Sequence, residues 1–147
     1  MKINKIIIIF MALFIWTACD NSNSTSSDSK PNSSWIFVAN EGIMDQSNGS
    51  ISMIDDVGNV YETDAIGDVV QSLEVYKDKL IVIVNNDHKI LIYNIDSEGI
   101  SIENTLIIPN ESFPREMVII NNKIYFTNWE PGDVKIINVL NEYFWRF

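Results

Sequence analysis

The feature that most constrains the fold of this 147-residue chain is an internal repeat. Residues 71–94 are followed by a similar segment, residues 115–138, displaced by 44 positions (from 71 to 115) without a gap. Identity is low, but apolar residues fall at matching positions, as Leu73 does with Met117. A period of about 20 to 50 residues is typical of proteins that stack one supersecondary unit several times. Each unit is then expected to bury its apolar face against a neighbouring unit.

A third, incomplete copy precedes these two. A shift of 88 residues places 37–40 on 125–128, and the match resumes at a shift of 83, with 48–51 on 131–134. The five additional residues of this copy fall in a polar loop, where insertions are tolerated best. The loop contains Asn48-Gly49, which is a strong signal for a tight turn.

Turn residues recur about every eight to twelve positions between short β-branched and aromatic runs, which predicts an all-β chain of antiparallel meanders. Beyond the N-terminal segment, no run longer than about ten residues has the 3.6-residue apolar period of a helix. Four short strands in about 44 residues is the size of one β-propeller blade. The expected strands are 35–40, 50–55, 59–63, 69–75, 80–84, 90–95, 101–108, 115–120, 124–128 and 134–139.

Residues 1–19 are interpreted as a targeting segment and not as part of the fold. Two lysines form a basic start, and the apolar run 6–16 is shorter than the about 20 residues of a membrane span. Small residues then lead to Cys19, the only cysteine. The segment resembles a bacterial lipoprotein signal peptide, in which this cysteine is lipidated and becomes the new N-terminus. The alternative is an ordinary secretory signal with a chance cysteine.

Residues 20–34 are mostly Ser, Asn and Asp and contain no large apolar residue. Such a segment cannot bury enough surface to order itself, so it is predicted to be a flexible tether between the lipid and the folded domain. The chain has 10 basic and 20 acidic residues, which argues against a nucleic-acid partner, because phosphates require Lys and Arg. We expect a lipid-anchored extracytoplasmic protein of the cell envelope, at the inner or the outer membrane.

The sequence Tyr-Phe-Thr-Asn at 125–128, followed by Val-Lys-Ile-Ile-Asn at 134–138, resembles the YVTN repeat of surface-layer-like β-propellers. In that family, a Tyr-Val-Thr-Asn strand is followed by a turn and a Val-x-Val-Ile-Asp strand. Residues 37–40 with 51–55 match this pattern again, and 81–85 with 90–94 match it more loosely. The resemblance implies a partial β-propeller at 35–147, with blades of four-stranded meanders at about 35–66, 67–110 and 111–147.

The resemblance also implies an incomplete ring of about two and a half blades, whereas this family closes about seven. The first copy lacks its innermost strand, which a closed ring takes from the C-terminus. The tail 141–147 has four aromatic residues and is not typical of an outer strand, so the last copy is expected to lack that strand. We interpret the gene as truncated or frameshifted near Leu140. The open blade faces then predict self-association.

The sequence gives little sign of catalytic or metal chemistry. His88, the only histidine, is predicted to be exposed in a tight turn, and a metal site needs three or four ligands. No Gly-rich phosphate loop, HExxH or GxSxG motif is present. The acidic loop 45–50 lacks the alternating oxygen ligands and distal Glu of a calcium-binding loop and is interpreted as a solvated turn. We therefore expect no cofactor, no metal and no catalytic residue.

The candidate ligand residues follow from propeller geometry. In a propeller, the inner strands begin near one mouth of the channel, on the face that also holds the loops between second and third strands. Gln71 and Arg115 are equivalent starts of inner strands, and Trp129 follows a second strand, although we favour inter-blade packing for Trp129. Polar residues at strand ends are interpreted as turn-forming residues that bond the backbone: Asn40, Asn85, Asn128, Asp55, Asn94 and Asn138.

Three functions remain open from the sequence. The first is a binding module at the cell surface or in the periplasm, with a protein or glycan partner. The second is a fragment of a propeller enzyme, since similar propellers occur in quinoprotein dehydrogenases and lactonases. The third is a truncated product without activity. An enzyme requires acidic, amide or histidine side chains that converge on a channel metal, and the sequence offers no such cluster, so the binding module is favoured.

Overall fold

The computed structural model describes residues 34–109 and 112–139, together with the backbone of 144–146. These residues belong to one compact unit, Pro31–Phe147. The predicted signal peptide with Cys19, and all of the tether except its last residue, lie outside the described residues. All regular secondary structure in the described part is β.

The strands follow the predicted order closely. They are β1 (Ile36–Asn40), β2 (Ser50–Ile54), β3 (Val60–Glu62), β4 (Val70–Tyr76), β5 (Lys79–Val84), β6 (Lys89–Asp96), β7 (Gly99–Ile107), β8 (Pro114–Ile120), β9 (Lys123–Asn128), β10 (Val134–Asn138) and β11 (Phe144–Arg146).

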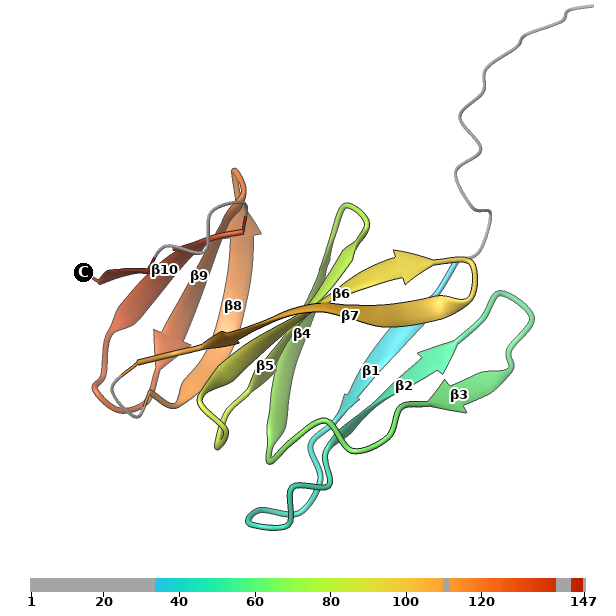
Figure 1. Cartoon of the computed structure of the whole chain (residues 1–147), viewed down its shortest axis with the longest axis horizontal. Coiled ribbons are helices and arrows are strands. Elements are labelled where there is room, and N and C mark those ends of the chain that lie inside the picture. Colours follow the sequence, from blue (N-terminus) through green and yellow to red (C-terminus); the bar gives the residue numbers. More distant parts are fainter. Residues whose placement is uncertain (1–33, 110–111, 140–143, 147) are drawn as a thin grey trace, which may run out of the picture. The chain divides into compact units, whose positions relative to one another are not determined.

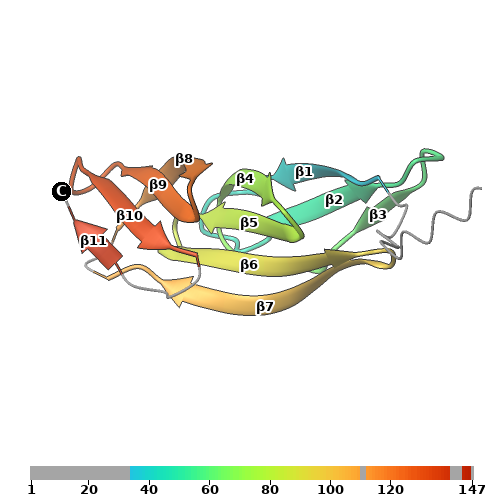
Figure 2. The same ribbon diagram turned by 90° about the horizontal axis from the view of Figure 1, so that it is seen from above.

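These strands form three antiparallel meanders in which consecutive strands pair (Figure 1). Sheet 1 has the order β1-β2-β3, sheet 2 has β4-β5-β6-β7, and sheet 3 has β11-β10-β9-β8. Figure 2 shows β4 to β7 laid out in this order. The prediction of an all-β chain of antiparallel meanders is confirmed for the described residues. Sheet 1 has no described strand before β1, at the place where the first copy is expected to lack its innermost strand.

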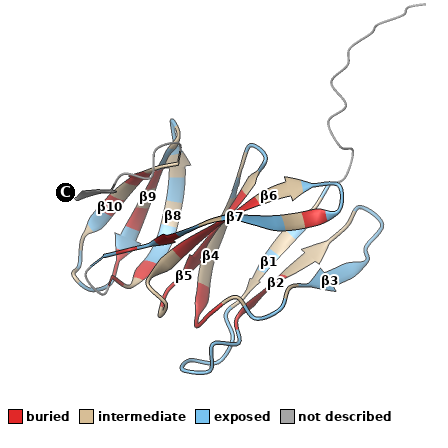
Figure 3. Ribbon diagram, viewed as in Figure 1, coloured by how far each residue is buried: buried red, intermediate tan, exposed pale blue. Residues whose placement is uncertain are grey.

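The β5 strand of sheet 2 is buried on both faces, which explains why it is an uninterrupted apolar run. Leu80 and Val82 belong to an apolar cluster with Ile51 of sheet 1. Ile81 and Ile83 point the other way, into a cluster that includes residues of sheet 3. Strands covered on both faces lose the alternation of apolar and polar residues, because neither face meets water. Buried residues accordingly run along β5 in Figure 3.

Sheet 3 keeps the alternation, because only one of its faces is covered within the described residues. Ile124 and Phe126 of β9 are buried against sheet 2, while Thr127 is exposed. In β8, the side chains of Val118 and Ile120 are 47% and 51% exposed. Because successive side chains of a strand point to opposite faces, sheet 3 has one packed face and one open face that carries exposed apolar residues.

The C-terminal tail corrects one prediction. We expected the aromatic tail not to provide an outer strand, but β11 pairs antiparallel with β10, placing Trp145 opposite Ile136. An unpaired strand edge offers a row of backbone N–H and C=O groups, and an extended aromatic segment has the propensity to bond to them. Sheet 3 thus has four strands, as sheet 2 does.

Candidate functional site

Two β-bulges lie at the starts of the innermost strands of sheets 2 and 3. In sheet 2, Val70 pairs with Val84 and Ser72 with Ile83, so Gln71 is the additional residue. In sheet 3, the register shifts between Pro114 and Met117, which includes Arg115 in the bulge. A bulge leaves one residue outside the ladder and redirects its side chain, and bulges are common beside functional sites. The two bulges occupy equivalent positions, 44 residues apart.

Both bulges open into one groove of 380 Å³. This groove, which we call the bulge groove, brings together all three of the ligand residues that were predicted from sequence. Its lining consists of polar, charged, aromatic and aliphatic side chains from the three sheets and their loops: Glu41, Met44, Val69, Gln71, Asn85, Asn86, Phe113, Arg115, Trp129 and Glu130.

The lining of the bulge groove repeats with the chain. The backbone N–H of Asn85 donates to Val69 O at 2.8 Å, and that of Trp129 donates to Phe113 O at 2.9 Å. These are the same hydrogen bond displaced by 44 residues. Glu41 stands 88 residues before Trp129, at the matching position of the first copy. The lining residues of the two complete copies therefore form pairs: Val69 with Phe113, Gln71 with Arg115, Asn85 with Trp129 and Asn86 with Glu130.

The pairing also explains why 81–85 matches the repeat only loosely. Asn85 was grouped with Asn40 and Asn128 at the ends of second strands, although it sits one position late in the repeat. The ladder pairs Val70 with Val84 and Pro114 with Asn128, so Val84 is the true equivalent of Asn128. Asn85 lies one position later. Its buried side-chain amide donates to Pro114 O at 2.7 Å, which ties sheet 2 to sheet 3.

Arg115 and Trp129 form a stacked pair in the bulge groove. The Cζ atom of Arg115 lies 5.5 Å from the centroid of the Trp129 ring, a cation–π distance. The Trp129 side chain is 69% exposed, so within the described residues it packs against no second sheet, and its interpretation as inter-blade packing stays a prediction. The indole packs under the guanidinium and not between two sheets, because the bulge directs Arg115 across it. Sequence spacing alone does not reveal this contact.

Val69 forms part of the groove floor in a strained backbone conformation. Its φ is 61°, and its side chain is almost completely buried. A β-branched residue in this left-handed region is an outlier that costs about 1–3 kcal/mol and persists only where its surroundings enforce it. Here the hydrogen bond from Asn85 N and the adjacent bulge at Gln71 enforce it.

Asp68 fixes the loop that forms another wall of the groove. Its carboxylate accepts hydrogen bonds from the backbone N–H of Asp45, at 3.0 and 3.1 Å to the two oxygens, and from Asn86 Nδ2 at 2.9 Å. The inserted loop of the first copy, which contributes Met44 to the lining, is thereby held beside Asn86. The hydrogen bond from Asn86, with those from the loop backbone, lowers the pKa of Asp68. The loop is therefore an ordered turn, and residues 41–48 are exposed, as the interpretation as a solvated turn expects.

His88 is half-buried, which corrects the prediction that it is exposed. Its Nδ1 lies 2.7 Å from Ser112 O, and its ring meets Phe113 edge-to-face with centroids 4.7 Å apart. The segment that leads into β8 covers the turn, a long-range contact that the local sequence does not show. His88 thus positions Phe113, a lining residue of the bulge groove.

The strand-end residues have mixed roles. Asp55 behaves as the turn interpretation expects, because its Oδ1 accepts from the backbone N–H of Val57 and Asn59. Asn40 instead donates to the hydroxyls of Ser50 and Ser52 across sheet 1.

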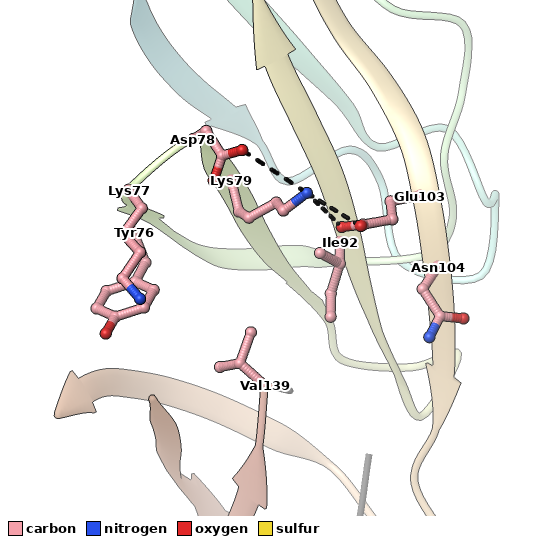
Figure 4. Close-up of a pocket in the computed structure, with 8 residues that line it drawn as sticks. All are labelled: Tyr76, Lys77, Asp78, Lys79, Ile92, Glu103, Asn104 and Val139. Atoms are coloured by element: carbon pink, nitrogen blue, oxygen red, sulfur yellow. Dashed lines mark hydrogen bonds and ion pairs between the residues drawn. The ribbon is translucent and has the colours of Figure 1, made fainter. Parts of the chain in front are cut away.

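A second groove, of 340 Å³, lies at the turn between β4 and β5 (Figure 4). Its charged groups already have partners. Lys79 Nζ forms an ion pair with Glu103 at 3.0 Å and donates to Asn94 Oδ1. Lys77 Nζ donates to Asn122 Oδ1 at 3.1 Å. A ligand would have to displace these contacts, so this groove is the weaker candidate.

The described residues contain no group of three or more His, Cys, Asp or Glu side chains that could hold a metal ion. In the same part of the chain, no helix is long and apolar enough to cross a membrane. The sequence matches no protein-family model and no curated protein at a significant level.

Proposed function

We propose that this chain is a lipid-anchored, extracytoplasmic part of a YVTN-type β-propeller and acts as a binding module at the bulge groove. The observation that carries this proposal is the pair of equivalent bulges, which direct Gln71 and Arg115 into one groove beside the exposed Trp129. Loops and bulges that break regular pairing at the same repeat position, on a rigid scaffold, are where binding residues concentrate.

The propeller assignment is supported by the position of the groove within the repeat. The lining comes from the starts of innermost strands and from the residues that follow second strands. In a propeller, both positions lie around one mouth of the central channel. The Ser-Asn-rich segment that precedes the sheets and the signal-like residues ending in Cys19 support a lipid anchor at the cell envelope.

The open sheet faces support contacts with further sheets of the same kind. On sheet 3, Val118 and Ile120 are about half exposed, whereas Ile83 on the corresponding side of sheet 2 is fully buried. On sheet 1, Ile36 and Val38 are 61% and 42% exposed. Adjacent exposed aliphatic residues of this kind favour association. We propose that a second copy of the chain covers one of these faces.

The binding function is tested by capture from separated protein and polysaccharide fractions of a bacterial cell envelope. The immobilised full chain is compared with a variant that combines Gln71→Ala, Arg115→Ala and Trp129→Ala, and with a control variant of the second groove, Lys77→Ala. We expect one envelope component to bind the wild type and the control but not the groove variant. Equal capture by all three proteins, or no capture, would overturn the proposal.

A further inference from the structure

We infer that the bulge groove binds a sugar that carries a carboxylate, such as a uronic acid residue at the end of a glycan. In this arrangement, Arg115 pairs with the carboxylate, Trp129 stacks on the sugar ring, and Gln71 and Asn86 bond to its hydroxyl groups. This inference rests on the proposed binding function and specifies the ligand of the same groove.

Arg115 points to a carboxylate. Within the described residues, its guanidinium has no hydrogen-bond or ion-pair partner and only lies over the Trp129 ring. Stacking uses the face of the guanidinium and leaves the N–H donors at its edge free. Those donors match the two oxygens of a carboxylate in a planar, bidentate pair. An aromatic surface beneath the guanidinium restricts its movement, so less conformational entropy is lost when the pair forms.

Trp129 points to a ligand with a flat apolar face. It is the most exposed aromatic side chain among those of the described residues, at 69% exposure. An indole exposed to this extent leaves a large apolar surface in water, which a ligand removes when it stacks on the ring. A pyranose ring offers C–H groups on one face and hydroxyl groups at its edge. Such a ring covers the indole while its hydroxyls remain near the polar lining.

The remaining polar lining combines neutral amides with two carboxylates, so only Arg115 offers a site for a negative charge. Gln71 and Asn86 each offer an amide donor and acceptor, which suits hydroxyl groups. Glu41 and Glu130 also line the groove, and their carboxylates accept hydrogen bonds from hydroxyls. These two glutamates and the formal net charge of −10 repel a ligand with several acidic groups. An acidic peptide or a polyanionic polymer therefore fits less well than one sugar acid.

The size of the groove agrees with a small saccharide. Its 380 Å³ lies in the range of small-molecule sites, about 300–1,000 Å³. The strained Val69 and the bulge at Gln71 form part of this surface. Because the structured loop held by Asp68 supplies another wall, the groove is largely formed before a ligand arrives.

The test is calorimetric titration of the purified full chain, in detergent, with methyl glucuronoside, methyl galacturonoside and disaccharides that contain either acid. We expect at least one of them to bind. Its methyl ester, which lacks the charge, should bind about tenfold more weakly or worse, because charge-assisted hydrogen bonds are lost. Arg115→Gln should weaken binding of the acid by a similar factor and leave binding of the ester unchanged, as expected for two partners of one interaction.

Two control variants separate the groove from general effects. Lys77→Gln removes a cation from the second groove and should leave the affinity unchanged. Trp129→Ala should weaken the binding of the acid and of the ester by the same factor, because stacking does not depend on the charge of the ligand. Arg115 and Trp129 are exposed, so thermal unfolding of their variants should match the wild type.

The inference is overturned if none of these uronides binds, or if the acid and the ester bind equally well. Tighter binding of an N-acetylated dipeptide carboxylate would also overturn it, because the ligand would then be a peptide. If the groove-dependent capture of an envelope component persists in either case, the proposed binding function stands and only the ligand class is wrong. If that capture fails as well, both are wrong.

Discussion

Replacing Ile83 by alanine tests whether sheet 2 is covered on both faces. Ile83 is completely buried in the cluster that sheets 2 and 3 share. The lost carbon atoms contribute about 2.4 kcal/mol, at about 0.8 kcal/mol per buried carbon. The cavity left behind raises the cost to about 3–4 kcal/mol. With a urea m-value of about 1–3 kcal/mol/M, the unfolding midpoint should fall by about 1–4 M.

The matched control is Ile120→Ala on the open face of sheet 3. The Ile120 side chain is 51% exposed, so the same truncation should cost only about 1 kcal/mol, with no cavity to add. Urea unfolding of both variants, at several protein concentrations, measures the difference. An equal loss of stability would refute the reasoning that sheet 3 is open, because Ile120 would then have to be covered in solution. If that loss depends on protein concentration, a second copy covers it.

Three further predictions concern the groove wall, the contact between sheets and the anchor. The lowered pKa of Asp68 implies stabilisation that is present above the ordinary pKa of about 3.9 and is lost as the pH falls through the lower folded value. As the pH falls below about 4, the wild type should therefore lose more stability than the Asp68→Asn variant, as measured by thermal unfolding. Parallel curves of unfolding temperature against pH for the two proteins would contradict this. Asn85→Ala should cost about 1–3 kcal/mol in urea, because Pro114 O loses its buried donor, and a loss under about 0.5 kcal/mol would count against that role. Cys19→Ser should move the chain from the membrane fraction to the soluble fraction, and membrane retention would rule out a lipid at this cysteine.

Strand positions could be predicted from the sequence, because they depend on local alternation and turn residues. The continuous apolar run of β5 also contained the information that this strand is covered on both faces. The outer strand β11 could not be predicted, because three residues carry no reliable period and their pairing depends on the free edge of β10. The prediction that His88 is exposed was wrong for a similar reason, because the segment that covers His88 is distant in sequence.

The repeat was also sufficient to predict that Gln71 and Arg115 lie on a common face. The bulges themselves were hidden, because one additional residue in a strand only shifts the apolar pattern by one position. The other lining residues were missed: Glu41, Met44, Val69, Asn85, Asn86, Phe113 and Glu130. A signal was present for Glu41 and Asn85, which stand 88 and 44 residues before Trp129. The stacking of Arg115 on Trp129 depends on side-chain direction, which spacing does not determine.

The most direct test of the binding site is an NMR titration of the isotope-labelled chain with the captured envelope component. The measurement compares side-chain signals in the bulge groove, from Arg115 and Trp129, with those in the second groove, from Lys79. We predict that the Arg115 Nε–H and the Trp129 indole N–H signals shift on binding, while the Lys79 signals do not. Shifts confined to the second groove would contradict the account and move the site to the turn between β4 and β5.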